Sequence, residues 1–398
     1  MKKLIYIFLF PLAILSCHTK GDETNTIETI RVDLENSDYI RLSSFFDRIS
    51  YTLLEDSESS LIGEIDKMEI KDGYLFIVSY KKVLVFDAKT GAFTSGLDNH
   101  GEGPGKYISL TDMYPETSGK KTEILDMGGR KIIQYDYDGN MIKEIPLPFS
   151  SLSFHKKDND YYLFFNGNIT SDDSDARLIH YNAKDQKIEH EYFPVDKHMA
   201  QYFHVFGGRN FNRFSRLSFV SSPEHIIYEI TDDWETIPLY KIDFGKNQTP
   251  ESFYEKDYSD IADFATKAIS NGYIYMLMNL VEDDKYIFFS NRYNDKTYWS
   301  VYDKKTHKIN TGHTLIDDIN FDNISLIPDY DNYYDIDNNS FYYLIYPEQF
   351  IELVENYKVQ NGDEKFNTLL ETHPDISQIY NSPGFNDQSN PILVTCKF

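Results

Sequence analysis

Positive charge is scarce in this sequence. Lys and Arg together number 39, against 64 Asp and Glu, so the formal net charge is −25 at pH 7. Proteins that bind phosphate backbones need a basic surface, so this composition argues against nucleic acid as a partner. The excess of acidic side chains instead helps to keep the chain of 398 residues soluble.

Motifs of hydrolytic enzymes are also absent. Gly-x-Ser-x-Gly, His-Glu-x-x-His and Cys-x-x-Cys do not occur, and the 11 histidines are scattered. A Ser, a His and an Asp from distant segments could still converge, because a catalytic triad is defined by geometry and not by order in the chain. The sequence therefore favours a non-enzymatic role without excluding an enzyme.

Long apolar runs are missing except near the start of the chain. The run at 4–15 follows two lysines and ends before the small residue Ser16. This order of charge, apolar stretch and small residue is typical of a secretory signal. The run is 12 residues long, whereas a membrane-spanning helix needs about 20. We therefore expect residues 1–16 to be a signal peptide.

Cysteine is rare, since the chain contains only Cys17 and Cys396. The stretch Ile14-Leu15-Ser16-Cys17 resembles the lipobox of bacterial lipoproteins, and this resemblance implies cleavage before Cys17 and lipidation of that residue. Several acyl chains anchor a protein firmly, whereas one binds only marginally. A lipidated Cys17 would leave Cys396 without an intrachain partner, so no internal disulfide is expected. The alternative is a secreted protein in which Cys17 is unmodified.

A polar stretch follows the signal. Residues 17–26 have no apolar periodicity, and we expect them to form a lipidated tether between the membrane and the body of the protein at 27–398. The piece Lys20-Gly21-Asp22-Glu23 partly resembles the acidic surface-export signals of Bacteroidetes lipoproteins. The expected location is the outer membrane, with the periplasmic face and the cell surface as alternatives.

The chain is rich in aromatic residues but poor in tryptophan. Its 32 Tyr and 28 Phe, against 2 Trp, favour strands over helices. One pattern recurs: a few apolar residues, an aromatic residue, and then a turn with Asp or Asn. It is centred on Phe86, Tyr135, Tyr181, Tyr228 and Tyr302. The spacing is about 46 to 49 residues except for a last step of 74, which indicates an array of repeats with one insertion.

Each repeat is predicted to be a four-stranded unit. The dipeptides Asp72-Gly73 and Asn338-Asn339 lie between apolar stretches, as turns do in β-hairpins. Four strands in roughly 45 residues is the size of a propeller blade, and a sixth repeat fits at 326–347. The sequence thus predicts an all-β, six-bladed β-propeller. To avoid open sheet edges, strands from the two ends should close the ring, with 28–34 and 391–398 as the candidate strands.

Helices are expected at two places only. Apolar residues at helical spacing between 244 and 273 explain the long step between repeats, and Gly272 could end this insertion helix. A second helical region is expected at 347–359 and 364–380, close to the C-terminus, after which the chain returns to strand.

These features together resemble a known family. The stretch GEGPGKY at 101–107, the repeated aromatic-Asp turns, the lipobox and the terminal SNPILVTCKF are similar to those of the six-bladed β-propeller lipoproteins of Bacteroidetes, a family of TolB-like or NHL-like discs. The resemblance extends over nearly all of 27–398 and implies a single propeller domain there. It implies no particular biochemical activity.

Three short stretches could bind an ion but are also typical of turns. DYDGN at 136–140 and DYDNYYDIDNN at 329–339 supply the carboxylates that calcium prefers, although neither fits an EF-hand loop. The glycines of 101–107 could present amides to a phosphate, but Pro104 and Tyr107 do not fit a P-loop. We predict that 101–107 is a turn between blades and that the two acidic stretches are blade turns. No cofactor is expected, with calcium left open as an alternative.

One segment gathers basic and aromatic residues in this acidic chain. QYFHVFGGRNFNRFSR at 201–216 contains the residue types that anchor many binding interfaces. The predicted ligand-binding residues are Tyr202, His204, Arg209, Arg213 and Arg216. In the alternative interpretation, the aromatic side chains fill the core of a blade and the arginines pair with neighbouring carboxylates.

Two functions remain open from the sequence. The first is a monomeric, non-enzymatic envelope lipoprotein that binds a glycan, a peptide or an envelope protein on one face of the disc, which is an analogy from the fold alone. The second is a calcium-dependent propeller enzyme that resembles lactonases or lyases. We favour the binding protein and predict no catalytic and no metal-binding residue.

Overall fold

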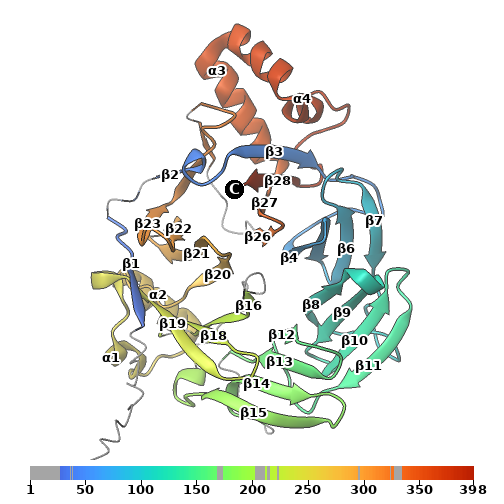
Figure 1. Cartoon of the computed structure of the whole chain (residues 1–398), viewed down its shortest axis with the longest axis vertical. Coiled ribbons are helices and arrows are strands. Elements are labelled where there is room, and N and C mark those ends of the chain that lie inside the picture. Colours follow the sequence, from blue (N-terminus) through green and yellow to red (C-terminus); the bar gives the residue numbers. More distant parts are fainter. Residues whose placement is uncertain are drawn as a thin grey trace, which may run out of the picture.

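Sheets of antiparallel strands make up most of the molecule. The computed structural model describes residues 27–35, 37, 39–167, 174–201, 211–212, 216–221, 224–294, 296–322, 324–326 and 334–398. Strands in these ranges form five four-stranded sheets, one five-stranded sheet and one three-stranded sheet. The four- and five-stranded sheets, named blades A to F in chain order, lie around a common centre (Figure 1). The expected β-propeller fold is confirmed.

In blades A, B, C and E the strands follow outwards from the centre in chain order, whereas blades D and F each have an N-terminal strand at the outer edge (Figure 1). Blade A contains β4 (Ile65–Lys71), β5 (Tyr74–Ser79), β6 (Lys82–Asp87) and β7 (Phe93–Leu97). Blade B contains β8 (Leu110–Glu116), β9 (Lys121–Asp126), β10 (Lys131–Asp136) and β11 (Met141–Pro146). Blade C contains β12 (Ser153–Lys156), β13 (Tyr161–Phe165), β14 (Ala176–Asn182) and β15 (Lys187–Pro194).

Two of the other three blades, D and F, include a strand from the N-terminal part of the chain. Blade D contains β16 (Phe211–Asn212), β17 (Ser218–Ser221), β18 (Ile226–Ile230) and β19 (Thr236–Asp243), with β1 (Glu28–Arg31) as its fifth strand. Blade E contains β20 (Met278–Glu282), β21 (Tyr286–Tyr293), β22 (Lys296–Asp303) and β23 (Lys308–Gly312). Blade F contains β26 (Tyr334–Asp337), β27 (Ser340–Ile345), β28 (Ile392–Lys397) and β3 (Arg48–Leu53). The three-stranded sheet contains β2 (Tyr39–Arg41), β24 (Thr314–Ile316) and β25 (Ser325–Leu326).

The helices are few and short apart from one. Single 3-10 turns occur at η1 (Leu42–Ser44), η2 (Thr117–Gly119), η3 (Met199–Gln201) and η4 (Gly245–Asn247). The predicted insertion contains α1 (Glu251–Tyr254) and α2 (Ile261–Ser270), and the predicted C-terminal helices are α3 (Pro347–Thr372) and α4 (Pro374–Tyr380). Both helical regions are therefore confirmed. Among the described residues, no helix is long and apolar enough to cross a membrane.

The predicted hairpin turns are present. Asp72 and Gly73 have φ angles of 51° and 80°, and Asn338 and Asn339 have 46° and 58°. Two successive residues with positive φ match the right-handed twist of paired strands, and Asp, Asn and Gly adopt this conformation most readily. The sequence therefore specified these turns locally.

The hydrophobic core is divided among the spaces between neighbouring blades. Six clusters of buried side chains occur in the described residues, each joining adjacent blades. The repeated aromatic residues lie on the third strand of their blades, and Phe86, Tyr135 and Tyr181 have no exposed surface. Phe86, for example, packs in one cluster with Tyr342 and Leu393 of blade F. The repeat found in the sequence thus reflects the filling of one inter-blade space after another.

Polar side chains also join the innermost strands of successive blades. Asp112 on β8 accepts the N–H of Phe154 on β12 at 2.8 Å, and Asn212 on β16 accepts the N–H of Glu282 on β20 at 3.0 Å. Asp335 on β26 accepts the N–H of Ile70 on β4 at 2.8 Å. Each bond satisfies a buried backbone donor that would otherwise cost about 1–3 kcal/mol. These bonds link blade B to C, D to E, and F to A.

The ring is closed by strands from opposite ends of the chain. The pair β28 and β3 is antiparallel, in a register from Ile392 opposite Leu53 to Lys397 opposite Arg48. Blade F is therefore built from three C-terminal strands and one N-terminal strand. The prediction that 391–398 would close the ring is correct, but its partner is β3 and not the segment 28–34.

The segment 28–34 has a different place. It contributes β1, which pairs in parallel with β19 of blade D, from Glu28 opposite Tyr240 to Arg31 opposite Asp243. Its apolar residues Ile30, Val32 and Leu34 are buried in the cluster between blades D and E. Both N-terminal segments alternate apolar and polar residues, so this pattern alone did not distinguish their partners.

Helices α3 and α4 lie beyond the outer edge of blade F (Figure 1). The side chain of Asp375 on α4 accepts the N–H of Tyr51 on β3 at a distance of 2.9 Å. Since β3 is the outermost strand of blade F, this bond satisfies a donor at an otherwise open sheet edge. The helices thus cover the strand that closes the ring.

A buried carboxyl group supports the same strand. The hydroxyl of Tyr51 donates to Asp317 Oδ2 at 2.6 Å, and Asp317 also accepts the backbone N–H groups of Ile319 and Asn320. Burial raises the pKa of Asp317 above its usual value, although the four donors around it act in the opposite direction. The carboxyl group therefore costs more free energy to bury when it is charged.

Removal of the closing strand should abolish stable folding. Deletion of 391–398 from the protein of residues 27–398 removes β28 from between β27 and β3, and it exposes parts of two core clusters. The loss should be comparable with the whole stability of a typical domain, about 5–15 kcal/mol.

Leu393→Ala, a milder change at a fully buried site, should cost about 2–5 kcal/mol in urea unfolding. Val359→Ala, at a side chain that is 82% exposed, is the control. Truncated and parent proteins that melt alike would contradict this closure.

Asp317→Asn should change how stability depends on pH. Because the folded pKa of Asp317 is raised, its favourable contribution is complete below the unfolded pKa, about 3.9, and is lost as pH rises through the folded value. The unfolding free energy of the parent protein minus that of the variant should therefore fall as pH rises from about 4. Urea unfolding at several pH values measures this difference. A difference that stays constant with pH would be incompatible with a raised pKa.

Candidate functional site

Most of the binding segment predicted from the sequence lies outside the described residues. This applies to Tyr202, His204, Arg209 and Arg213, and also to the predicted lipidation site, Cys17. Arg216 is described and lies between β16 and β17 of blade D. The other four ligand-binding residues remain predictions.

Arg216 takes part in a buried polar network between blades D and E. Its guanidinium approaches Glu282 Oε1 with Nη2 at 2.6 Å and with Nε at 2.9 Å. Ser218 and Lys304 donate to the same carboxylate, at 3.0 and 2.5 Å. Burial alone would lower the pKa of Arg216, but the charge and hydrogen bonds of Glu282 raise it. For this arginine, the described contacts are those of the alternative interpretation, in which arginines pair with carboxylates of the same chain.

The long connections of the propeller gather on one face. In a blade of four antiparallel strands, the last strand ends at the level where the first begins, so connections between blades leave from the same face as the turn between the second and third strands. The insertion with α1 and α2 and the η3 turn belong to such connections. We call this side the connection face.

A cleft of about 1030 Å³ lies on the connection face, at blade D. Its floor is formed by three neighbouring strands: Ile226 from β18, Lys241 and Asp243 from β19, and Thr29 and Arg31 from β1. In the sheet register, Lys241 lies opposite both Ile226 and Thr29. These strands lie side by side at the lower left of Figure 1, close to α1.

One wall of the cleft comes from the insertion. Gln248, Thr249, Glu251, Tyr254 and Glu255 line it, and they belong to α1 and the segment that precedes it. Thr249 Oγ1 donates to the carbonyl of Ile274 at 2.7 Å, and Gln248 Nε2 lies 3.0 Å from His225 Nδ1. Burial lowers the pKa of His225 to about 4, so this ring is neutral at pH 7. The insertion is therefore held firmly against blade D.

The other wall comes from the connection between blades C and D. Asp196, His198 and Met199 line the cleft there. Asp196 Oδ1 accepts the N–H groups of His198 and Met199, at 2.8 and 3.3 Å, which fixes this turn. His198 Nε2 lies 3.0 Å from Asp257 Oδ1, so the two walls are joined by a polar contact.

An ion pair closes the inner end of the cleft. Arg177 of β14 donates to Glu224 through Nη1 and Nη2 at 3.2 and 3.0 Å, and Ser221 Oγ donates to the same carboxylate at 2.8 Å. Burial would raise the pKa of Glu224, but its bonds to Arg177 lower it below the usual value. Glu224 is thus an anion with two strong partners and is part of the scaffold of the cleft.

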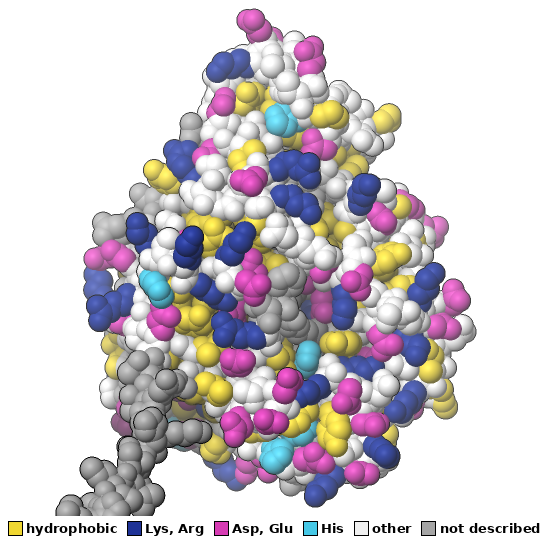
Figure 2. Space-filling model, viewed as in Figure 1, with side chains coloured by type: hydrophobic (Ala, Val, Ile, Leu, Met, Phe, Trp, Pro, Cys, Tyr) yellow, Lys and Arg dark blue, Asp and Glu magenta, His cyan; other side chains and the backbone are white. Residues whose placement is uncertain are grey.

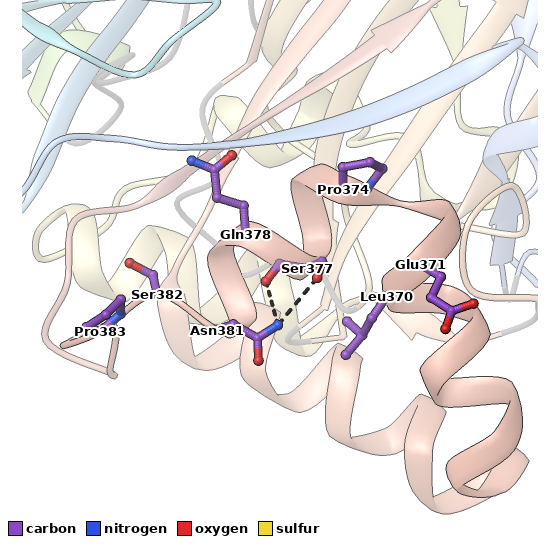
Figure 3. Close-up of a pocket in the computed structure, with 8 residues that line it drawn as sticks. All are labelled: Leu370, Glu371, Pro374, Ser377, Gln378, Asn381, Ser382 and Pro383. Carbon is purple, nitrogen blue, oxygen red and sulfur yellow. Dashed lines mark hydrogen bonds between the residues drawn. The ribbon is translucent and has the colours of Figure 1, made fainter.

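A second, more open groove of about 640 Å³ lies between α3 and α4 (Figure 3). It is lined by one short segment, from Leu370 to Pro383. Asn381 Nδ2 bonds to the backbone oxygen of Ser377 at 2.9 Å and to its hydroxyl at 3.3 Å, so these polar groups partner each other. The cleft at blade D is the better candidate because four separate segments with several charged groups converge on it.

Charge is otherwise spread widely over the molecule. Figure 2 shows acidic and basic side chains interspersed over one face of the disc, with hydrophobic side chains scattered among them. In the described part of the chain, no group of three or more His, Cys, Asp or Glu residues could hold a metal ion.

The stretches considered for ion binding form turns where they are described. In 136–140, the Asp136 carboxylate accepts the backbone and side-chain N–H groups of Asn140, at 2.8 and 3.0 Å, within the hairpin between β10 and β11. In 101–107, which joins blades A and B, Tyr107 is buried and donates to the carbonyl of Lys81 at 2.5 Å. Part of 329–339 lies outside the described residues, and Asp335 within it forms the inter-blade bond to Ile70.

The residues of the cleft were not predicted from the sequence. They come from 29–31, 196–199, 224–226 and 241–255, segments that are far apart in the chain. Their charged side chains look like ordinary exposed residues, which occur throughout an acidic surface. The one available signal was the insertion itself, because long connections in compact domains are often functional.

The fold of this chain is similar to the folds of two Bacteroides proteins. A Bacteroides fragilis protein described as exported has 17% identity and a TM-score of 0.70, with 94% of this chain and 99% of the other covered. A DUF4221 family member from Bacteroides vulgatus has 11% identity and a TM-score of 0.52, covering 88% and 96%. At these identities the likeness concerns the fold.

The sequence matches a protein-family model, and no curated protein matches it. The family model described as a domain of unknown function, DUF4934, matches residues 25–397. This range includes blades A to F, the insertion that follows blade D and the C-terminal helices. The chain therefore belongs to the DUF4934 family.

Proposed function

We propose that this protein is a six-bladed envelope lipoprotein that binds a ligand in the cleft of blade D and does not act as an enzyme. The observation that carries the proposal is the cleft itself, which four segments of the chain build together. Its volume of about 1030 Å³ is at the upper end of the 300–1,000 Å³ range typical of small-molecule sites. A glycan, a peptide or part of an envelope protein could occupy it.

The proposal includes a lipid anchor at Cys17. The signal-like residues 1–16 and the lipobox-like stretch that ends at Cys17 support it, and a similar fold occurs in a protein described as exported. A tether of 17–26 could extend about 35 Å at most, so the disc would stay close to the outer membrane. The periplasmic face and the cell surface remain alternatives, and we expect a monomer.

Blocking the cleft tests the binding function. Thr29→Trp places a large side chain on the floor, where Thr29 is exposed on β1, and tryptophan is well tolerated in strands. The protein of residues 27–398 should gain melting temperature with ligands from a panel of glycans and peptides, because binding to the folded state stabilises it. The variant should lose this gain. Thr94→Trp, on the exposed side of β7 in blade A, is the matched control and should keep it.

Equal responses of Thr29→Trp and the parent protein would rule out this cleft as the binding site. The same melting experiment with calcium and with a chelator addresses the alternative function. A shift caused by calcium would support a calcium-dependent enzyme, and it would count against the binding protein proposed here.

Cys17→Ser tests the anchor. Expressed in cells that lipidate exported proteins, the full chain should fractionate with membranes, and the variant should move to the soluble fraction because it lacks the acylated thiol. Cys396→Ala is the control, since Cys396 is buried within blade F. A Cys17→Ser protein that stays with the membranes would show that the chain is held there by other means.

A further inference from the structure

The floor and one wall of the cleft carry charges of opposite sign. Lys241 on the floor is exposed, and within the described residues its side chain has no ion pair or hydrogen bond. On the neighbouring strand, Arg31 has a side chain that is 86% exposed, and its one ion pair in the described ranges is a contact of 3.7 Å to Asp243. The floor thus offers two cationic groups to a ligand, whereas its own carboxylate, Asp243, accepts the N–H of Gly245 at 2.8 Å.

The facing wall offers carboxylates. Glu251 begins α1 and Glu255 caps its end, one helical turn later, so the two side chains lie on the same side of the helix. Both residues are exposed, and the described residues provide neither with an ion pair or a hydrogen bond through its side chain. Glu224, by contrast, is already bound by Arg177. Asp196 and Asp243 accept backbone N–H groups, so in the described part of the chain Glu251 and Glu255 are the carboxylates of the cleft without such a bond.

The cleft has little to offer a neutral sugar ring. Sugars are commonly held by stacking on an exposed aromatic face, and Tyr254 is the aromatic residue among those that line the cleft. Its side chain is buried, with only 8% of the residue exposed. A ligand that carries both charges would instead satisfy Lys241 on one side and the two glutamates on the other, and charge-assisted hydrogen bonds are the stronger kind.

We infer that the ligand of this cleft is a short peptide with free ends, its carboxylate at Lys241 and its ammonium group at Glu251 and Glu255. The inference rests on the proposed function, and it selects the peptide among the ligands considered there. Lys241, Glu251 and Glu255 are all exposed, so their substitution should leave the fold intact. The melting temperature of each variant, measured without peptide, should equal that of the parent protein, which checks that the fold is intact.

Paired changes in protein and peptide test the inference. The probe is a pool of random tetrapeptides with free ends, compared with the same pool after N-acetylation or C-amidation, and binding to the protein of residues 27–398 is measured by calorimetry. C-amidation should weaken binding about tenfold or more, as expected for the loss of a charged hydrogen bond. In Lys241→Gln, amidation should have no further effect. In the double variant Glu251→Gln/Glu255→Gln, N-acetylation of the peptides should not weaken binding any further.

The remaining outcomes overturn either the peptide inference or the proposed binding function of the cleft. Binding of maltotetraose, but not of the free pool, that is lost in Thr29→Trp would leave the cleft as a binding site and overturn the peptide inference. Free and capped pools that bind equally well would also overturn it, because the charged ends would then contribute nothing. If every probe bound Thr29→Trp as it binds the parent, the proposed function of the cleft would fail as well.

Discussion

The antiparallel pairing of β3 with β28 is the interaction on which the rest of this structure depends. It joins the two ends of the chain within blade F, and the bond between Tyr51 and Asp375 beside it spans 324 residues of sequence. The core is a ring of clusters between blades, so each blade buries apolar side chains against a neighbour on both sides. Leu393 of β28 packs towards blade A, whereas Val394 packs in the cluster shared with blade E. Without this strand, two inter-blade clusters would be open to water.

The same N-terminal segment also builds the candidate site. From β1 on blade D the chain passes through β2, which pairs with β24, to β3 on blade F. Before the first complete blade begins, this segment therefore contributes strands to blade D, to the three-stranded sheet and to blade F. Thr29 and Arg31 lie at its start and form part of the floor of the cleft. A single segment thus completes the ring at one end and the candidate cleft at the other, directly after the predicted tether.

The sequence was most informative where structure is local. The aromatic repeats predicted the blade strands on which Tyr135 and Tyr181 lie, and the turn at Asn338-Asn339 was specified by the two residues themselves. The assignment of the closing strand was less successful, because 28–34 and 48–53 carry similar alternating patterns and only their distant partners distinguish them.

The site was harder to predict for a related reason. Arg216 and Glu282 are 66 residues apart, so a basic residue that looked available for a ligand has an internal partner which the sequence does not indicate. The cleft brings Lys241 of β19 and Glu251 of α1 into one lining together with residues of the connection between blades C and D. Nothing in the local pattern of either residue differs from an ordinary charged surface residue.

Hydrogen exchange of the backbone amides of β3 and β28, in the protein of residues 27–398, tests the closure of the ring most directly. If the pairing holds the whole disc together, the amides of 48–53 and 392–397 should exchange only through global unfolding, as slowly as those of the inner strands. Fast exchange of 48–53, with the inner strands still protected, would contradict this account, because the ring would then remain folded while its closing strand is open.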